Sequence, residues 1–447
     1  MSPMSAFRRD CPLASMLATL VFCTAVAVPW SANAAVIPVT NCNDSGPGSF
    51  RDAVASAVDG DTLDASVTPF CAIRITSEVV VPQDNLAIRG RSGNPVIIET
   101  FIRTSRLIRH TGTGTLSFFG VALDSGRLAG PIAMGGCVLS NGHVDLDTSQ
   151  VEFCEAIAEG EGSMALGGGI HARSVHAHNT RFDNNRAVGD NSSGGAISSE
   201  GRVTLLLATL GGNDANYGGA VSSLGGATVT YSFILSNRAW RDNGGMQVSG
   251  GSVTVNKSLI DSNVAGRRCG GLCVAGTGRT SVLDSTISRN RAPFLGAGEL
   301  SDDATVSNST IAYNTDTSGS ECVGVIRARR LRLESAIIAS NACQAAGQTA
   351  YDVGGRAWEG YTIAGHDNLV GRSRVPVPAD TISADPMLAP IAQNGGVSST
   401  FALMPGSPAI DHGNNVFNRL YDQRGPGFPR VVGSNADIGA FEVQLPE

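Results

Sequence analysis

The same short pattern returns along the middle of this chain at a spacing of about 26 residues, in SFILSNRA (232–239), SLIDSNVA (258–265) and STISRNRA (285–292). The repeated asparagines are Asn185, Asn213, Asn237, Asn263, Asn290, Asn314 and Asn341. Successive steps between them are 28, 24, 26, 27, 24 and 27 residues. A period of this size indicates that each copy folds as one unit and stacks on the next copy.

Two further landmarks run in step with the asparagines. An apolar residue stands three positions before each of them: Phe182, Leu210, Ile234, Ile260, Ile287, Ile311 and Ile338. A Gly-Gly pair precedes each of the first five asparagines by about 19 residues, and β-branched stretches such as ATVTYS (227–232) lie between the two landmarks. An earlier copy, VEFCEA (151–156), has Cys154 in place of the asparagine. Each copy therefore predicts three short strands separated by turns.

The spacing favours one repeat architecture over others. A leucine-rich repeat needs an L-x-x-L-x-L pattern, which is absent. A helix between strands is also absent from the pattern, which excludes a doubly wound sheet. We predict an all-β, single-stranded right-handed parallel β-helix of about 26 residues per coil. Coils would stack at about 4.8 Å, with isoleucines packed inside and asparagine amides bonded along the stack.

Composition limits the function classes. The chain has 447 residues, 55 glycines, 5% aromatic residues and a formal net charge of −7. This acidic balance argues against a nucleic-acid partner, which needs clustered positive charge. One lysine, Lys257, accompanies 31 arginines, an imbalance that we interpret as genome-wide bias, so arginine clusters are weak evidence for sites.

The N-terminus resembles an export signal. FRR (7–9) supplies positive charge, residues 13–28 are apolar, and Ala32 and Ala34 form a small-residue cleavage pattern. A transmembrane anchor is disfavoured because the apolar run is short and is followed by Pro29. We expect a signal peptide over 1–34, cleavage after Ala34, and no transmembrane segment in the mature chain.

The ends of a stacked coil need covers. SFRDAVASAV (49–58) predicts an amphipathic capping helix, with a capping-box-like start at Ser49 and Asp52 and an apolar stripe of Phe50, Val54, Ala57 and Val58. We expect an N-terminal cap and first coils over 35–110, β-helix repeats over 111–370, and an irregular, proline-rich tail over 371–447 that covers the other end.

Eight cysteines remain after signal removal, and an even number in an exported chain suggests disulfides. Zinc binding by Cys269 and Cys273 is disfavoured because C-x3-C lacks a second ligand pair. Sequence proximity and equivalent repeat positions favour the pairs Cys42–Cys71, Cys137–Cys154, Cys269–Cys273 and Cys322–Cys343, among 105 connectivities.

Several segments outside the repeat carry a family resemblance. NDSGPGSFRDAV (43–54), DPMLAPIAQNGG (385–396), GSPAID (406–411) and DIGAFE (437–442), with the Gly-Gly and Asn coils, resemble the bacterial exported β-helix proteins of the choice-of-anchor Q type, in the pectin-lyase-like group. The resemblance implies an exported β-helix protein without an evident catalytic role. The chain differs from that family in having no recognisable C-terminal anchor, which favours free secretion.

The wider group includes polysaccharide lyases and hydrolases, whose chemistry needs carboxylates that lie close together. Asp183 and Asp261 share a repeat position but are 78 residues, or three coils, apart. That separation is roughly 14 Å, beyond the about 6.5–9.5 Å of an inverting pair. Gly211 and Leu235 occupy the positions between them. The repeat columns therefore predict no catalytic pair, although Asp302, Asp303 and Asp316 could converge from loops.

Other polar groups have plain structural interpretations that we favour. Arg186, Arg238 and Arg291 share one repeat position, where an outward stripe could meet an acidic glycan. The cluster RARRLR (327–332) could bind an acidic ligand. His176 and His178, near His171, share a strand face as in a two-ligand metal site, and DGDTLD (59–64) begins like a calcium loop. We expect Asp411, Asp422, Arg424 and Asp437 to pin the tail by ion pairs and turn bonds.

These observations favour a secreted or cell-surface protein, extracellular or periplasmic, that binds glycan or another macromolecule along its flank without catalysis. A polysaccharide lyase or glycoside hydrolase of the pectin-lyase-like group is the alternative. No cofactor, metal site or catalytic residue is assigned. The expected partner is an extracellular polysaccharide or a cell-surface component.

Overall fold

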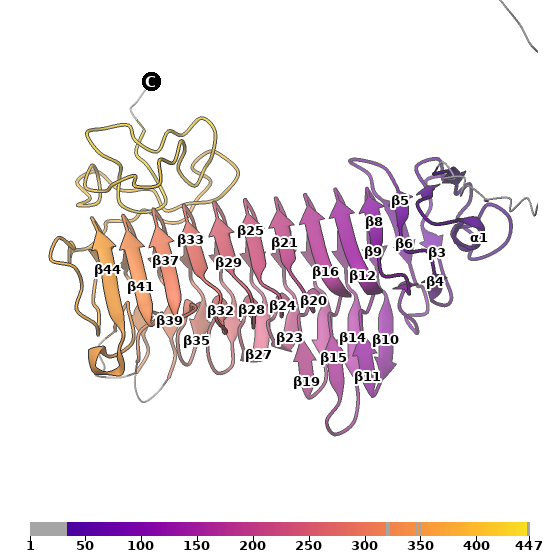
Figure 1. Ribbon diagram of the computed structural model, residues 1–447, viewed down its shortest axis with the longest axis horizontal. Coiled ribbons are helices and arrows are strands. Elements are labelled where there is room, and N and C mark those ends of the chain that lie inside the picture. Colours follow the sequence, from indigo (N-terminus) through magenta and orange to yellow (C-terminus); the bar gives the residue numbers. More distant parts are fainter. Residues whose placement is uncertain (1–33, 319–321, 346, 348–349, 445–447) are drawn as a thin grey trace, which may run out of the picture. The chain divides into compact units, whose positions relative to one another are not determined.

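The computed structural model describes residues 34–318, 322–345, 347 and 350–444 of the chain. The predicted signal peptide therefore lies almost wholly outside the described residues. Within them, three sheets of parallel strands wind through successive coils, as expected for a right-handed parallel β-helix (Figure 1). The predicted fold class is confirmed.

Sheet A has 21 strands, and one row of them, from β5 to β44, forms the upper row of arrows in Figure 1. Its strands are β1 (Val36–Pro38), β2 (Thr62–Asp64), β4 (Val79–Val81), β5 (Leu86–Arg89), β7 (Ile108–His110), β8 (Thr115–Phe119), β12 (Val138–Asp147), β16 (Ile170–His178), β20 (Ile197–Ser199), β21 (Val203–Leu206), β24 (Val221–Ser223), β25 (Ala227–Thr230), β28 (Met246–Val248), β29 (Val253–Asn256), β32 (Leu272–Val274), β33 (Thr280–Leu283), β36 (Gly298–Glu299), β37 (Asp303–Ser307), β40 (Ile326–Arg327), β41 (Arg330–Glu334) and β44 (Thr362–His366).

Sheets B and C have 12 strands each. Sheet B contains β3 (Ile73–Arg74), β6 (Val96–Glu99), β9 (Val121–Asp124), β13 (Gln150–Glu152), β17 (Arg181–Asp183), β22 (Thr209–Gly211), β26 (Phe233–Leu235), β30 (Leu259–Asp261), β34 (Thr286–Ser288), β38 (Thr310–Ala312), β42 (Ile337–Ala339) and β45 (Leu369–Val370). Sheet C contains β10 (Arg127–Gly130), β11 (Ile132–Met134), β14 (Glu155–Ala158), β15 (Met164–Leu166), β18 (Arg186–Val188), β19 (Asn191–Ser193), β23 (Asp214–Tyr217), β27 (Arg238–Asp242), β31 (Val264–Ala265), β35 (Arg291–Ala292), β39 (Thr315–Asp316) and β43 (Ala342–Cys343).

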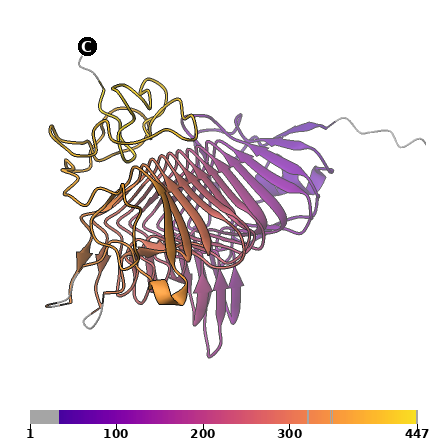
Figure 2. The same ribbon diagram turned by 60° about the vertical axis from the view of Figure 1, so that its left-hand side comes forward.

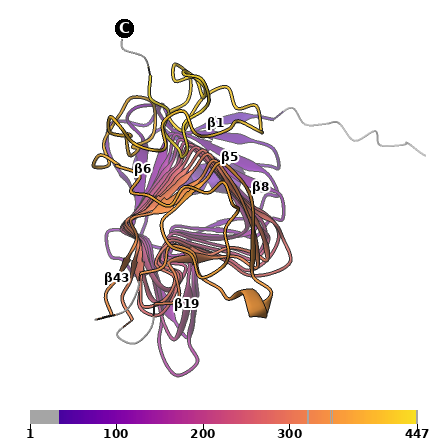
Figure 3. The same cartoon turned by 90° about the vertical axis from the view of Figure 1, so that its left-hand side faces the viewer.

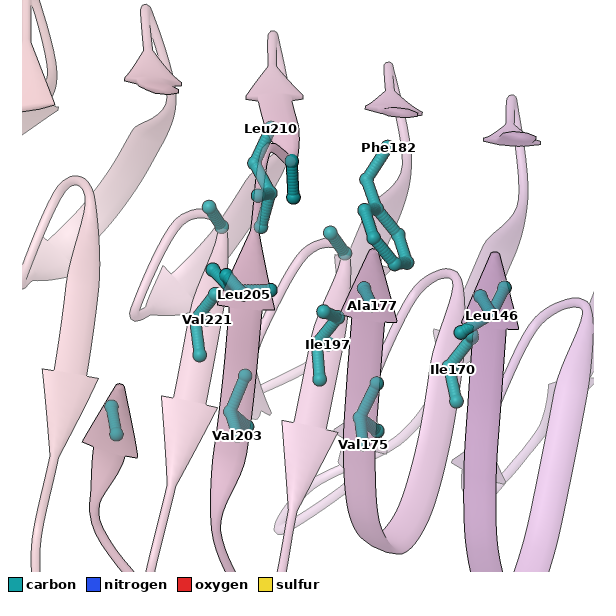
Figure 4. Packing of buried hydrophobic residues seen from close by; sticks show 14 of the residues in the cluster. Leu146, Ile170, Val175, Ala177, Phe182, Ile197, Val203, Leu205, Leu210 and Val221 are labelled. Atoms are coloured by element: carbon teal, nitrogen blue, oxygen red, sulfur yellow. The ribbon is translucent and has the colours of Figure 1, made fainter. Parts of the chain in front are cut away.

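The apolar column of the repeat lies on the inner face of sheet B. Ile234, Ile260 and Ile287 are register partners on consecutive coils, and each is completely buried. Figure 4 shows the earlier members of this column, Phe182 and Leu210, above side chains of sheet A such as Leu205. The predicted register is confirmed, and it places one large apolar side chain per coil in the core.

The asparagine column is also as predicted. The Asn263 amide nitrogen donates to the Asn290 Oδ1 at 2.9 Å and to the Ile234 carbonyl oxygen at 2.9 Å. Its own Oδ1 accepts from the Asn237 backbone N–H at 3.0 Å. The same bonds continue along the stack, so each buried turn has its backbone satisfied by the side chain of a neighbouring coil. The Gly-Gly landmark has a steric cause, since a Cβ on Gly219 would lie 2.1 Å from the Gly244 carbonyl oxygen.

The N-terminal cover contains the predicted helix, α1 (Phe50–Ser56). Ser49 is its N-cap and accepts from the Asp52 N–H, while the Asp52 carboxylate accepts from the Gly48 N–H. Phe50 and Val54 are buried, but Val58 is 54% exposed. The inclusion of Val58 in the buried stripe was wrong, because the helix ends at Ser56 and Val58 no longer follows the helical period. The one other helix of the described residues is the short 3-10 helix η1 (Ala357–Glu359).

The tail after Val370 is irregular, and it packs mainly on the outer face of sheet B. Its first part continues the ladder through a bridge between Leu369 and Ile382. Farther on, Gln423 accepts from Thr286 and the Ala440 N–H donates to Thr310. Figures 1 and 2 show the tail in yellow beside the C-terminal half of the coils, and Figure 3 shows it on the outer side of the coils when the stack is viewed from its end. The tail was expected to cover the end of the stack, but most of it covers a flank instead, because the outward residues of β38 and β42 are apolar there.

Three of the four expected disulfides are present: Cys42–Cys71, Cys137–Cys154 and Cys322–Cys343. The pair Cys269–Cys273 was predicted wrongly, because both thiols are free. Cys269 occupies the positive-φ corner before a Gly-Gly pair, whereas Cys273 lies on β32, and no bond joins their sulfurs. Disulfides in this number are typical of oxidising compartments and are consistent with an exported protein.

Candidate functional site

A step interrupts the outer surface of sheet C. Three coils carry a second strand there, namely β11, β15 and β19, and these strands project below the coils in Figure 1. The last of them pairs with β23 through Ser193 and Tyr217, and the next coil has β27 alone. The longer coils therefore end in a wall that stands beside the shorter coils.

A hollow of about 340 Å³ lies at this step. Its lining includes Arg186, Asp190, Asn216 and Trp240. The wall is held by local bonds: the Asn216 amide donates to the Gly189 and Asp190 carbonyl oxygens at 2.8 and 3.1 Å. These bonds hold Asn216 and the backbone at Asp190, which form the polar rim of the hollow, in a defined position.

Trp240 provides an aromatic surface in the hollow and is 51% exposed. The guanidinium carbon of Arg238 lies 3.5 Å from the centroid of the indole ring. Beside it, burial raises the pKa of the Asp214 carboxyl group, against the opposing effect of Arg186, Arg238 and the Trp240 side chain. An exposed indole with guanidinium and amide groups around it can stack a sugar ring and bond its polar substituents.

The arginine stripe predicted from the repeat is present on this sheet. Arg186 pairs with Asp214 in register, and Arg238 pairs with Asp214 and with Val264. Arg291 follows on β35 and donates to the Gln344 side chain at 3.0 Å. All three arginines are exposed, and two of them belong to the Trp240 surroundings. Asp214 and Val264 therefore interrupt the arginine stripe, and its first arginine, Arg186, lines the hollow.

The RARRLR cluster divides between two faces. Arg327 bonds Glu299, whereas Arg330 and Arg332 line a hollow of about 450 Å³ on sheet A together with Arg279. Arg330 is paired with Asp303, and Arg332 with the buried Glu334 at 2.8 Å. These ion pairs neutralise part of the cluster, so its charge is lower than the sequence indicates.

A row of carboxylates runs along sheet B on four consecutive coils. Glu99 pairs with Asp124, Asp124 with Glu152, and Glu152 with Asp183. Arg181 bonds Asp183 at 2.5 Å. Burial, with the Asp183 charge next in order and Asp124 a smaller contributor, raises the pKa of the Glu152 carboxyl group, and Arg181 opposes the shift.

The repeat columns were expected to hold no pair of carboxylates at catalytic spacing, but Glu152 and Asp183 lie on adjacent coils beside Arg181. Asp183 continues toward Gly211 and Leu235 as predicted, and Asp261 lies farther along the same column. The carboxylates lie on the other side of Asp183, where the copy VEFCEA (151–156) aligns Glu152 with Asp183 although Cys154 replaces the asparagine. The apolar column continues there as Val151 and Leu123, which was a usable signal.

The histidines lie against aspartates of the preceding coil. The Nδ1 atoms of His176 and His178 are 2.8 and 2.9 Å from the carboxylates of Asp145 and Asp147, respectively. His171 is buried elsewhere on β16, beside Ser198. Each exposed imidazole thus has its own carboxylate partner. Asp145 and Asp147 also line a hollow on sheet A with Phe119 and Arg89.

The remaining predicted sites have structural roles. In DGDTLD, Asp61 accepts from the Ala35 and Val58 N–H groups at 2.7 and 2.8 Å, as a turn residue does. Asp303 lies on sheet A and Asp316 on sheet C, so the loop aspartates do not converge. Burial raises the pKa of Asp316 to about 7.

The tail residues behave as expected. Asp422 and Arg424 form a buried ion pair at 2.6 Å, and the Asp437 carboxylate accepts from the Asp411 N–H at 2.8 Å. Asp411 in turn accepts from the Ser434 N–H at 2.9 Å. These bonds hold the segments of the tail together.

The fold places the chain among parallel β-helix proteins. No family model matches the chain, and no curated protein matches it. Among solved structures, the chain is similar to the crystal structure of pectate lyase Pel9A, at 14% identity and a TM-score of 0.38, over 92% of this chain and 97% of that one. The fold assignment itself depends on the strand pairing. Among the described residues, no helix has the length and apolar character needed to cross a membrane.

Proposed function

We propose that this chain is an exported β-helix protein that binds a glycan in the Trp240 hollow and does not cleave it. The hollow carries the proposal, because it combines an exposed indole with the Arg186 guanidinium and the Asn216 and Asp190 rim. An indole ring offers a flat apolar surface for the C–H face of a sugar. A guanidinium is suited to the carboxylate of a uronic acid.

Export and family membership belong to the same proposal. The charged, apolar and small-residue regions at the N-terminus support export with cleavage after Ala34. The GSPAID (406–411) and DIGAFE (437–442) segments support membership of the choice-of-anchor Q type. We also propose the division into 1–34, 35–110, 111–370 and 371–447 as the signal, the N-terminal cap, the coils and the tail.

Binding to immobilised polyuronate and neutral glycans tests the proposal. The change Trp240→Ala should weaken binding roughly 10-fold, since a stacked aromatic contact contributes up to about 1.5 kcal/mol. The matched control is Trp358→Ala, which removes a 78% exposed indole that also lies under an arginine but is remote in sequence and outside the hollow.

Two arginine variants distinguish a specific binding site from nonspecific binding. Arg186→Ser should weaken polyuronate binding more than neutral-glycan binding, whereas Arg291→Ser, from the same stripe, should change neither. Equal losses in the two tryptophan variants, or no binding by the parent protein, would contradict the proposed site.

A second candidate function is polysaccharide cleavage, and the carboxylate row on sheet B favours it. Burial raises the pKa of the Glu152 carboxyl group, so it can hold a proton, while the neighbouring Asp183 carboxylate forms an ion pair with Arg181. Register partners lie about 4.8 Å apart, close to the about 5–5.5 Å between the carboxyl groups of a retaining pair. Unequal carboxyl groups at this spacing are typical of an acid and a nucleophile.

Product analysis distinguishes cleavage from binding. If the parent protein releases oligosaccharides and both Glu152→Gln and Asp183→Asn abolish the release, the second candidate replaces the first. Retained binding with no products, and no effect of the two substitutions on affinity, supports a binding protein. Calcium should be included in one arm, because carboxylates on adjacent coils are oxygen donors that suit it.

A further inference from the structure

The two free thiols lie together with a carboxylate. Cys269 is buried at the corner before β32, and Cys273 lies on that strand with its side chain partly exposed. Glu299, on the next coil, is the register partner of Cys273. The two Sγ atoms and a Glu299 carboxylate oxygen all lie within 4.8 Å of one another.

Three ligand atoms at this separation are near the geometry of a tetrahedral metal site. Zinc–sulfur and zinc–oxygen bonds of about 2.3 and 2.0 Å place tetrahedral ligand atoms about 3.5–3.8 Å apart. Small side-chain rotations would close the remaining gap. The sequence offered only the two cysteines, and the third ligand becomes visible once the coils are stacked.

The carboxylate is already oriented by its neighbours. Arg327 donates to one oxygen of Glu299 at 2.8 Å, and Arg268 bonds the other. Arg327 contacts the Glu299 Oε1 with two nitrogens, whereas Oε2 has only the Arg268 contact and keeps one lone pair for a metal. Outer-shell bonds of this kind commonly hold metal-ligating carboxylates in place.

Two amide oxygens on the preceding coil have no hydrogen-bond partner. Gln247 is the register partner of Cys273, and its Oε1 is buried and unpaired. Asn243 is the neighbour of Cys269, because Asp242 bridges to Arg268, and its Oδ1 is likewise unpaired. The Asn243 residue is only 6% exposed. Unpaired buried oxygens are costly, and these two belong to residues that adjoin Cys273 and Cys269 in the stack, so a cation bound there could accept one of them as a ligand.

The charge balance of the cluster also permits a cation. As free thiols, Cys269 and Cys273 are neutral and Glu299 is matched by Arg268 and Arg327, for a local charge of +1. Divalent metal binding releases the two thiol protons as it adds two positive charges, so the local charge stays +1. The cluster therefore gains no net charge on loading.

We propose that Cys269, Cys273 and Glu299 bind a thiophilic divalent cation of the zinc class, with an oxygen from Gln247 or solvent in the fourth position. Thiolate ligands select such metals over calcium and magnesium. The site is independent of the Trp240 hollow, since it lies on sheet A and shares no residue with it. Coordination keeps both thiols out of the disulfide chemistry that has joined the other cysteines of the mature chain.

Zinc titration of the mature protein tests the site. The protein is purified with its disulfides intact, freed of metal, and titrated with zinc against a chromophoric chelator. We expect one equivalent to bind and to raise the melting temperature, because the ion binds the folded state. Cobalt in place of zinc should give a thiolate-to-metal absorption band.

Variants identify the ligands. Cys269→Ser and Cys273→Ser should each lower zinc affinity at least 100-fold and remove the cobalt band, and Glu299→Gln should lower affinity at least 10-fold. Asp303→Asn is the control, because Asp303 is another arginine-paired carboxylate on the same sheet and should bind zinc like the parent. Cys273 is partly exposed, so its serine variant should melt like the metal-free parent.

Three results would overturn the proposal. The first is that the metal-free parent has two titratable thiols but binds no zinc. The second is that zinc still binds to the Cys269→Ser/Cys273→Ser double variant. The third is that peptide mapping finds these two cysteines joined by a disulfide in the secreted protein.

Discussion

At the scale of single residues, the coil depends on side chains that complete the backbone of a neighbouring turn. The asparagine column does this at one corner, and a serine column does it at another, where the Ser232 N–H donates to Ser258 Oγ at 3.0 Å. Both columns are buried, so water cannot replace a lost partner. Each member therefore stabilises its own coil and the one before it.

Asn263→Ala should lower the free energy of unfolding by about 3–5 kcal/mol, because it leaves the Asn237 N–H and the Ile234 carbonyl oxygen buried without their partners. Chemical denaturation checks this value. The control Asn141→Ala removes an exposed amide with one bond of 3.3 Å and should cost about 0.5 kcal/mol or less. Similar losses in both variants would mean that the column adds nothing beyond ordinary packing.

At the scale of the elements, each coil is stabilised by its neighbours, so a buried charged group without a partner on one strand lowers the stability of the adjoining strands as well. Asp316 on β39 is such a group, since it is 1% exposed and has no cationic partner among the described residues. Its Oδ1 accepts from the Gly296 N–H at 2.7 Å, but its Oδ2 has no partner. The burial of this carboxyl group raises its pKa from 3.8 to about 7.

The raised pKa of Asp316 predicts a pH dependence of stability. Between pH 4 and 7 the folded state binds more protons than the unfolded state, so its contribution is complete below about pH 4 and is lost as the pH rises through 7. Compared with Asp316→Asn, the parent should lose up to about 4 kcal/mol of unfolding free energy between pH 4 and pH 8. Urea unfolding of both proteins at each pH measures the difference.

The control for this pH experiment is Asp303→Asn, which changes an exposed aspartate whose pKa is lowered by its bond to Arg330. Its contribution to stability should have the opposite sign, being present at neutral pH and lost in acid. A parent-to-variant difference at Asp316 that does not change with pH would show that this carboxyl group titrates normally in the folded protein.

At the scale of residues 34–444, the coils and the tail are joined by a small number of buried polar contacts. Lys257 donates from Nζ to the Tyr421 and Asp422 carbonyl oxygens at 2.6 and 2.5 Å and pairs with Asp284 at 3.4 Å. Arg430 is completely buried and bonds Glu442 at 2.9 Å within the tail. Burial lowers the pKa of Lys257 while Asp284 opposes the shift. The lone lysine thus connects a coil to a segment about 165 residues later.

Lys257→Met should release the tail without unwinding the coils. It leaves Asp284 buried with fewer cationic neighbours and removes two bonds to the tail backbone, at a cost of about 3–5 kcal/mol. Limited proteolysis followed by mass spectrometry should place the first cuts within 371–447. The control Arg181→Met removes an exposed arginine of sheet B that pairs with Asp183 rather than with the tail, and it should be cut like the parent. Identical digestion of both variants would contradict the role of Lys257.

The sequence by itself determined the coil, its register and most of its cysteine pairing. Equivalent residues such as Ile234 and Ile260 must superpose in a stacked repeat, so a period read along the chain becomes a column in space. The helix at Ser49 and the bonds within the tail were also predictable, because capping and ion-pair signals act between residues close in sequence or within one segment.

Only the tertiary structure decided where the sites lie. The hollow at Trp240 exists because coils of different length meet there, and the position of the tail depends on which outward faces are apolar. The carboxylate row through Glu152 and the approach of Glu299 to two cysteines arise between coils, and each becomes visible only when neighbouring coils are compared side by side. The periodicity of a repeat determines which residues stack on one another. The sites on its surface depend instead on how coils of different length and sequence pack side by side.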